Sequence, residues 1–218
     1  MPILHIGVLA LVQGVTEFLP ISSSGHLILV SAVTSWPDQG LAIDVAMHVG
    51  TLGAVILYFH RDLWSMIADL TRMAKGRYDP GARLAGYLVL GTVPAVIAGF
   101  LFDRYYPGGI RGLEVIAWTT LGFGILLFSA DKLGMTVRQL KHLGSGDVIV
   151  IGLAQVLALV PGTSRSGITM TAGRLLGLER KEAARFSLLL SIPVILGAGA
   201  LMGWELYRGG DPQLTSEA

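Results

Sequence analysis

Two short polar clusters interrupt apolar stretches of this chain, and both carry residue types that bind or transfer phosphate. The first lies at 13–26 and combines Glu17 with a run of serines followed by His26. The second lies at 160–167 and places Arg165 between two serines. Arginine binds phosphate through two parallel hydrogen bonds, and a serine beside a histidine is a potential activated nucleophile. These side chains predict a site for a phosphorylated headgroup.

Ionisable residues in apolar surroundings are expensive to bury and are usually functional. Glu17 and Arg165 carry the strongest signal, because burying either without a partner destabilises a protein by several kcal/mol. The alternative is a structural ion pair that joins the two clusters. Asp44 and His48 lie four residues apart, so they can satisfy each other on one helical face. We favour a structural role for His48, with Asp44 as a supporting acid near the site as the alternative.

The composition is that of a membrane protein. Of the 218 residues, 52% are hydrophobic and only 14% are charged, whereas soluble domains carry about 25% charged residues. The absence of cysteine excludes a disulfide framework, a thiolate metal site and a cysteine nucleophile. The net charge of +1 excludes a broad basic face for nucleic acid.

The apolar stretches predict membrane spans and two interrupted segments. Crossing a bilayer takes about 20 apolar residues, and four stretches qualify, at 41–59, 84–102, 113–130 and 186–207. Segments 3–36 and 148–178 are too long for one span and are broken by proline, glycine and serine. The short pieces after the breaks, 26–35 and 168–178, reach only about half of a ~30 Å core. We predict half-helices of two re-entrant hairpins, with kinked full spans as the alternative.

The distribution of Lys and Arg favours re-entry of segment 148–178. With re-entry, eleven of the loop cations share one face and three lie on the other, as expected when positive loops are cytoplasmic. Segment 3–36 then enters from the opposite side. The apolar spacing within 63–73 predicts a surface helix at the cytoplasmic interface.

The two interrupted segments resemble each other. Residues 11–25 and 153–167 share five identities in fifteen ungapped positions, among them Gln13 with Gln155 and Gly25 with Gly167. Hairpins that enter from opposite sides form an inverted repeat whose half-helix N-termini favour anions. The sequence therefore predicts an all-α, polytopic membrane bundle in one domain, 1–218. Its repeats are 1–130, with hairpin 3–36, and 131–218, with hairpin 148–178.

The motifs QGVTEFLPISSSGHL (13–27) and PGTSRSG (161–167) resemble the two signatures of the undecaprenyl-diphosphate phosphatase family of the bacitracin-resistance type. The resemblance implies a bacterial inner-membrane hydrolase that acts on a phosphoanhydride in a polyprenyl diphosphate lipid. It releases phosphate and recycles the carrier lipid for peptidoglycan synthesis, with bacitracin resistance. The resemblance also implies a divalent cation, Mg²⁺ or Ca²⁺, and a site open to the periplasm. Members of the family continue past residue 207 with further spans, so we expect this chain to be truncated at its C-terminus.

The family motifs assign roles by position. The resemblance places the E/Q-x-x-x-E motif on Gln13 and Glu17, the motif serine on Ser23, the histidine on His26 and the arginine on Arg165. We expect catalytic roles for Ser23, His26, Glu17 and Arg165, with Glu17 also holding the metal. The expected substrate-binding residues are Gln13, Ser22, Ser24, Gly25, Thr163, Ser164, Ser166 and Gly167.

The mechanistic hypothesis is attack by Ser23 on the terminal phosphorus. His26 and Glu17 manage the serine proton, and Arg165 neutralises charge on the phosphoryl oxygens. Attack by His26 is the alternative. A transporter or flippase of polyprenyl phosphates is the rival function, because inverted repeats with broken helices are typical of transporters. A transporter would have no use for a serine–histidine pair beside the carboxylate.

Overall fold

The computed structural model describes residues 2–34, 36–73, 75–77, 79–106, 110, 112–134 and 137–207, and the regular elements within these ranges are all helices. The all-α prediction is therefore confirmed. The α-helices are α1 (Ile3–Thr16), α2 (Ser23–Thr34), α3 (Gly40–Tyr58), α4 (His60–Met73), α5 (Pro80–Tyr105), α6 (Leu113–Leu133), α7 (Ser145–Val156), α8 (Arg165–Leu175) and α9 (Arg180–Tyr207). Two 3₁₀ turns, η1 (Leu140–His142) and η2 (Leu157–Leu159), flank α7.

The long helices match the predicted spans. Among the described residues, α5, α6 and the Arg180–Trp204 part of α9 are long and apolar enough to cross a membrane. The span expected at 41–59 is α3, which qualifies only together with α4, and the two are bent by 77°. The surface helix expected at 63–73 is α4, which begins earlier, at His60.

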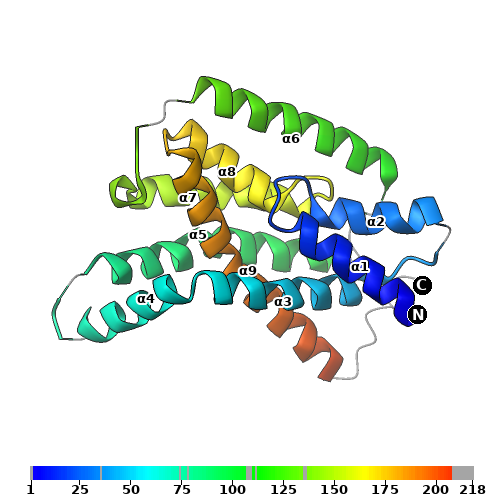
Figure 1. Ribbon diagram of the computed structural model, residues 1–218, viewed down its shortest axis with the longest axis horizontal. Coiled ribbons are helices and arrows are strands. Elements are labelled where there is room, and N and C mark those ends of the chain that lie inside the picture. Colours follow the sequence, from blue (N-terminus) through cyan, green and yellow to red (C-terminus); the bar gives the residue numbers. More distant parts are fainter. Residues whose placement is uncertain are drawn as a thin grey trace.

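The interrupted segments fold as the two expected hairpins, α1–α2 and α7–α8, whose bends lie side by side near the middle of the molecule (Figure 1). Among the arms, α1 has 14 residues and α7 with η2 spans Ser145–Leu159, so each reaches only about 21–23 Å at 1.5 Å per residue, short of a ~30 Å hydrocarbon core. The arms are therefore too short to cross a membrane singly, as re-entry requires.

The predicted starts of the short helices, residues 26 and 168, were three residues too late. The helices α2 and α8 begin at Ser23 and Arg165. Serine side chains cap both, since Ser22 Oγ accepts from the Gly25 amide at 3.3 Å and Ser164 Oγ from the Gly167 amide at 3.1 Å. A serine that caps a helix precedes its first turn, so the serine-rich motifs belong to the helices.

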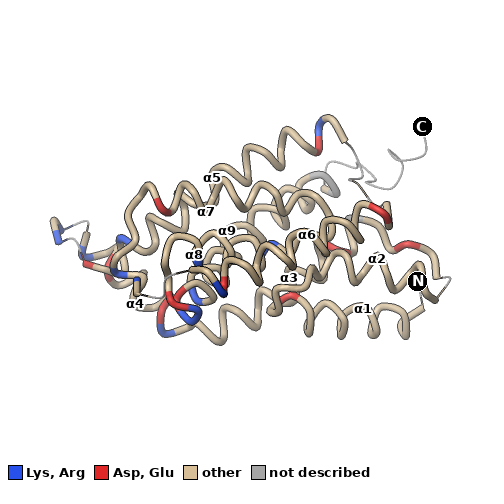
Figure 2. Tube along the Cα trace, turned by 90° about the horizontal axis from the view of Figure 1, so that it is seen from above, with Lys and Arg blue, Asp and Glu red and all other residues tan. Residues whose placement is uncertain are grey.

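Helix α9 is the centre of the bundle, because it packs against α3, α5 and α8. The buried core follows these contacts, with Leu52, Leu88, Ile151, Phe186 and Leu190 among its members. Charged residues gather mainly toward the two ends of the long axis, and most of the basic residues lie at the end that holds α4 (Figure 2). The apolar middle therefore holds the hairpin bends and their polar residues.

Candidate active site

The first hairpin bend carries the motif glutamate and serine. Helix α1 presents Gln13 and ends at Thr16, and Glu17 follows as its C-terminal cap residue. The chain turns through Pro20 to Ser22, whose φ of 60° lies in the left-handed region that non-glycine residues rarely adopt. This turn brings Ser23, the first residue of α2, back onto Glu17, with Ser23 Oγ donating to Glu17 Oε2 at 2.6 Å.

The second hairpin bend repeats this arrangement. Ser164 and Ser166 lie 3.1 Å apart through their hydroxyls, as Ser22 and Ser24 do at 3.4 Å. The residue between the serines is Ser23 in the first bend and Arg165 in the second. Each is the first residue of its short helix, so the matching turns deliver a hydroxyl and a guanidinium to one place.

Glu17 is where the two bends meet, and only 6% of it is exposed. Its Oε1 accepts from Arg165 Nη2 at 2.7 Å. Its Oε2 accepts from Ser23 and, at 2.9 Å, from Gln13 Nε2. The carboxylate is thus hydrogen-bonded to one residue of its own helix and to one residue of each bend. The structure therefore brings Gln13, Glu17, Ser23 and Arg165 together as the motifs predict.

The histidine beside this cluster is His48, whereas the sequence singled out His26. His48 Nε2 lies 3.2 Å from Glu17 Oε2 and 3.4 Å from Ser23 Oγ. His26 points its Nδ1 at the backbone oxygen of Ser22, 2.8 Å away. Asp44 contacts His48 through its backbone, since its carbonyl oxygen lies 2.7 Å from His48 Nδ1, and its carboxylate accepts from Gln39 Nε2 at 2.7 Å.

Three buried polar atoms have no hydrogen-bond partner among the described residues: Arg165 Nη1 and Gln13 Oε1 in the cluster, and Thr163 Oγ1 in the second bend. Such atoms are costly to leave unsatisfied. The guanidinium N–H and the threonine hydroxyl are donors that suit anionic oxygens. The cluster is therefore incomplete in a way that a phosphate would complete.

The other predicted binding residues shape the bends. Ser166 Oγ donates to the backbone oxygen of Leu19 at 3.2 Å and so ties the second bend to the first. Gly25 and Gly167 donate their amides to the capping serines. Ser22 and Ser164 are therefore committed to capping, and Arg165 and Thr163 remain as the donors that can reach a ligand.

The residues present suit a cation only in partnership with its ligand. Among the described residues, no three His, Cys, Asp or Glu side chains group as metal ligands. The free amide oxygen of Gln13 lies beside Glu17, and hard cations accept one carboxylate, an amide oxygen and substrate phosphates. Gln13 and Glu17 are therefore the residues that would hold a divalent cation, together with the oxygens of a phosphorylated ligand.

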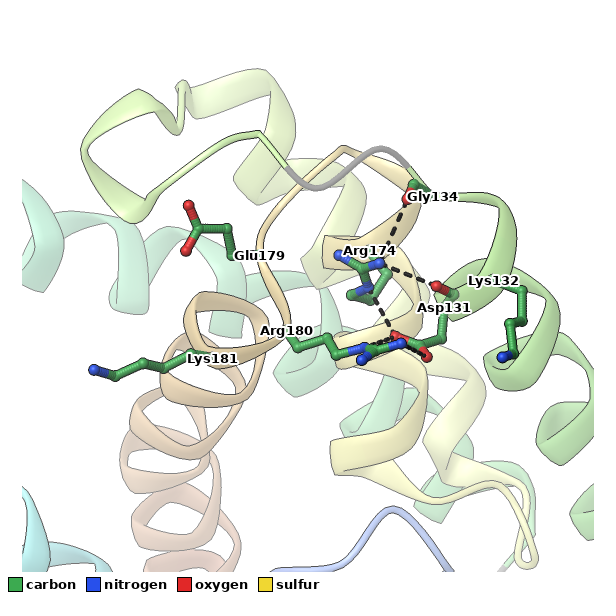
Figure 3. Close-up of a pocket in the computed structure, with 7 residues that line it drawn as sticks. All are labelled: Asp131, Lys132, Gly134, Arg174, Glu179, Arg180 and Lys181. Atoms are coloured by element: carbon green, nitrogen blue, oxygen red, sulfur yellow. Dashed lines mark hydrogen bonds and ion pairs between the residues drawn. The ribbon is translucent and has the colours of Figure 1, made fainter.

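A cavity of about 490 Å³ lies elsewhere, between the ends of α6 and α8 and the start of α9 (Figure 3). In it Asp131 accepts from Arg174 Nε at 3.2 Å and from two nitrogens of Arg180 at 2.7 and 2.8 Å. Arg174 also donates to backbone oxygens of Asp131, Gly134 and Leu178. The Arg174 donors all bond to groups within the protein, and Asp131 also binds Arg180. We therefore interpret this cluster as a structural contact that joins α6, α8 and α9.

Fold and site together define a multi-pass helical membrane protein in which two hairpin bends form a buried site. In this site a serine and an arginine contact the same glutamate. Residues 6–217 match the family described as bacitracin resistance protein BacA, and the chain belongs to this family. Undecaprenyl-diphosphatase 1 of Rhodospirillum rubrum is 55% identical over all of this chain and 80% of its own length. Undecaprenyl-diphosphatases of Teredinibacter turnerae and Ruegeria pomeroyi are 52% and 49% identical, over 94% and 100% of this chain and 78% and 82% of their own lengths.

Proposed function

We propose that this protein hydrolyses undecaprenyl diphosphate to undecaprenyl phosphate and inorganic phosphate. The names of its relatives support this substrate. The observation that carries the chemistry is the contact of Glu17 with both Ser23 Oγ, at 2.6 Å, and Arg165, at 2.7 Å. A carboxylate that accepts a hydrogen bond from the serine hydroxyl is positioned to act as its general base, and the arginine beside it can bind phosphate.

In the first step, Ser23 Oγ attacks the terminal phosphorus while its proton passes to Glu17. The bond from phosphorus to the bridging oxygen breaks, and undecaprenyl phosphate leaves. Arg165, through its unpartnered Nη1, and Thr163 hydrogen-bond to the phosphoryl oxygens where charge is greatest, which is most of the catalytic task in phosphoryl transfer.

In the second step, water attacks the phosphoserine and inorganic phosphate leaves as Ser23 regains its proton. His26, whose ring contacts the backbone oxygen of Ser22, lies in the first turn of α2, three residues after Ser23, and is the alternative nucleophile. A divalent cation held by Gln13 and Glu17 would neutralise further charge on the two phosphates. Trapping a phospho-enzyme and locating the phosphate by mass spectrometry distinguishes Ser23 from His26.

The proposed setting is the bacterial inner membrane, with the site open to the periplasm and the polyprenyl chain in the lipid. The product is then the carrier lipid that peptidoglycan synthesis reuses. Its recycling would account for bacitracin resistance, the trait that gives the family its description.

The test is phosphate release from undecaprenyl diphosphate by the purified chain in detergent. We expect release that EDTA suppresses and that Ser23→Ala or Arg165→Ala lowers by at least about 100-fold. Ser129→Ala, on the exposed side of α6, and Arg72→Ala, on α4, are matched controls that keep wild-type rates. Equal rates in all variants would refute the proposal, as would binding of the lipid without phosphate release, the result expected of a transporter.

A further inference from the structure

His48, on α3, contacts the cluster of Gln13, Glu17, Ser23 and Arg165. Gln13, Glu17, Ser23 and Arg165 all belong to the short hairpins, whereas His48 belongs to the long helix α3. Helix α3 packs directly against α9, so closely that a Cβ on Gly199 would lie 2.8 Å from Val49 Cγ2. His48 therefore projects from a helix packed into the bundle onto the Ser23–Glu17 pair.

The orientation of the His48 ring is set by its own helix. A backbone carbonyl only accepts hydrogen bonds, so the 2.7 Å contact with the Asp44 oxygen requires a hydrogen on Nδ1. With Nδ1 held in this way, Nε2 faces Glu17 Oε2 at 3.2 Å and Ser23 Oγ at 3.4 Å. A single ring atom thus touches both the expected nucleophile and its base.

We propose that His48 is a positioning residue for the Ser23–Glu17 pair. A serine hydroxyl has three staggered positions, and the contacts with Nε2 and Glu17 select the one in which Oγ lies between them. Arg165, on α8, donates to Glu17 Oε1, whereas His48, on α3, contacts Glu17 Oε2. The two residues therefore hold the two oxygens of the carboxylate from different helices. The inference rests on the proposed serine chemistry and adds a residue that neither signature motif contains.

The test compares amides of two lengths at position 48. The Nε2 of glutamine can reach the place of the histidine Nε2, whereas the asparagine amide reaches only the place of Nδ1. We expect His48→Asn to lower kcat about 10- to 100-fold, with KM within about two-fold, because a displacement near 1 Å at the reacting atoms has that effect. We expect His48→Gln to restore kcat to within about five-fold of wild type.

The control is His60→Asn, since the exposed His60 ring also bonds a backbone oxygen, that of Leu57 at 2.8 Å, away from the cluster. Thermal melts check that each variant folds. If His48→Asn does not fold, His48→Leu replaces it in the test. Wild-type kcat in His48→Asn or in His48→Leu, or equal losses for asparagine and glutamine, would overturn the positioning role. Absence of phosphate release by the wild-type protein would instead overturn the proposed function.

Discussion

Gly162, in the bend that delivers Arg165, is the residue at which one added methyl group should be most damaging. Its φ of +89° lies in the left-handed region. A Cβ there would lie 2.1 Å from Thr119 Oγ1 and 2.6 Å from the backbone oxygen of Ile116. Thr119 and Thr120 also donate to the backbone oxygens of Pro161 and Gly162, at 2.6 and 3.2 Å. Helix α6 therefore packs closely against this bend, and the methyl group of Gly162→Ala must displace the bend from α6.

The magnitude has two parts. The left-handed conformation costs an alanine about 1–2 kcal/mol, and overpacking against backbone costs about 1–3 kcal/mol. We therefore expect Gly162→Ala to lower the free energy of unfolding by about 2–5 kcal/mol. Because Arg165 follows three residues later, the shifted bend should also lower the rate of phosphate release.

Substitutions at two other glycines measure the conformational cost and the packing cost separately. Gly76 has a φ of +81°, and no described atom lies within 4 Å of its added Cβ, so Gly76→Ala should cost only about 1 kcal/mol. Gly152 is helical, and its Cβ would lie 2.6 Å from the backbone oxygen of Gly91. Gly152→Ala should cost about 0–2 kcal/mol, since alanine favours the helix by about 1 kcal/mol.

The assay is unfolding of the purified protein in mixed micelles, followed by circular dichroism, with phosphate release measured on the same samples. The reasoning requires Gly162→Ala to be the most destabilising of the three substitutions. If Gly162→Ala lowers the free energy of unfolding no more than Gly76→Ala does, then α6 does not pack against the second bend as closely as described.

Three further outcomes follow from the contacts. Glu17→Gln and Arg165→Met should each lower the free energy of unfolding by about 3 kcal/mol, and the double variant by clearly less than the sum, because each single change leaves a buried charge unpaired; additive losses in unfolding titrations would contradict the ion pair. The hydrogen bond from Arg138 lowers the pKa of the Asp147 carboxyl below its usual value, so the stability gained from the pair is present above about pH 4 and is lost as the pH falls through the lowered pKa. Asp147→Asn should therefore cost at most about 1 kcal/mol at pH 7 and progressively less as the pH falls through the lowered pKa, and a cost that does not change with pH would contradict the linkage. Ser22→Ala should be about 1 kcal/mol less stable than Ser22→Gly, because both remove the cap but only glycine tolerates a φ of 60° without strain; equal melting temperatures would argue against the strained turn.

The hairpins and the paired motifs were predictable because their signals are local. Apolar length indicates a span, and proline and glycine mark a break. The late starts assigned to α2 and α8 came from placing the helices after the glycines. Ser164 with Gly167 three residues on is the spacing of an N-cap serine and the amide that it accepts from, and that signal would have located the start correctly.

His48 could not be placed from spacing. The four-residue interval to Asp44 correctly put both residues on one helical face, but it did not show that Nδ1 of the ring bonds the backbone and that Nε2 faces Glu17 and Ser23. Its neighbour Ser23 lies 25 residues away in sequence, and only the packing of α1 against α3 brings the two together. The available signal was general, since an ionisable residue at membrane depth favours function, and it applied to His48 as much as to Glu17.

The repeated bends explain why a short chain segment can build this site. Both bends use a serine cap and a serine-to-serine contact, although Ser22 has a φ of 60° and Ser164 a φ of −65°. The residue enclosed by the serines is then free to differ, and it is Ser23 in one bend and Arg165 in the other. Both contact Glu17, so the two serine caps bring the hydroxyl of one bend and the guanidinium of the other to the same carboxylate.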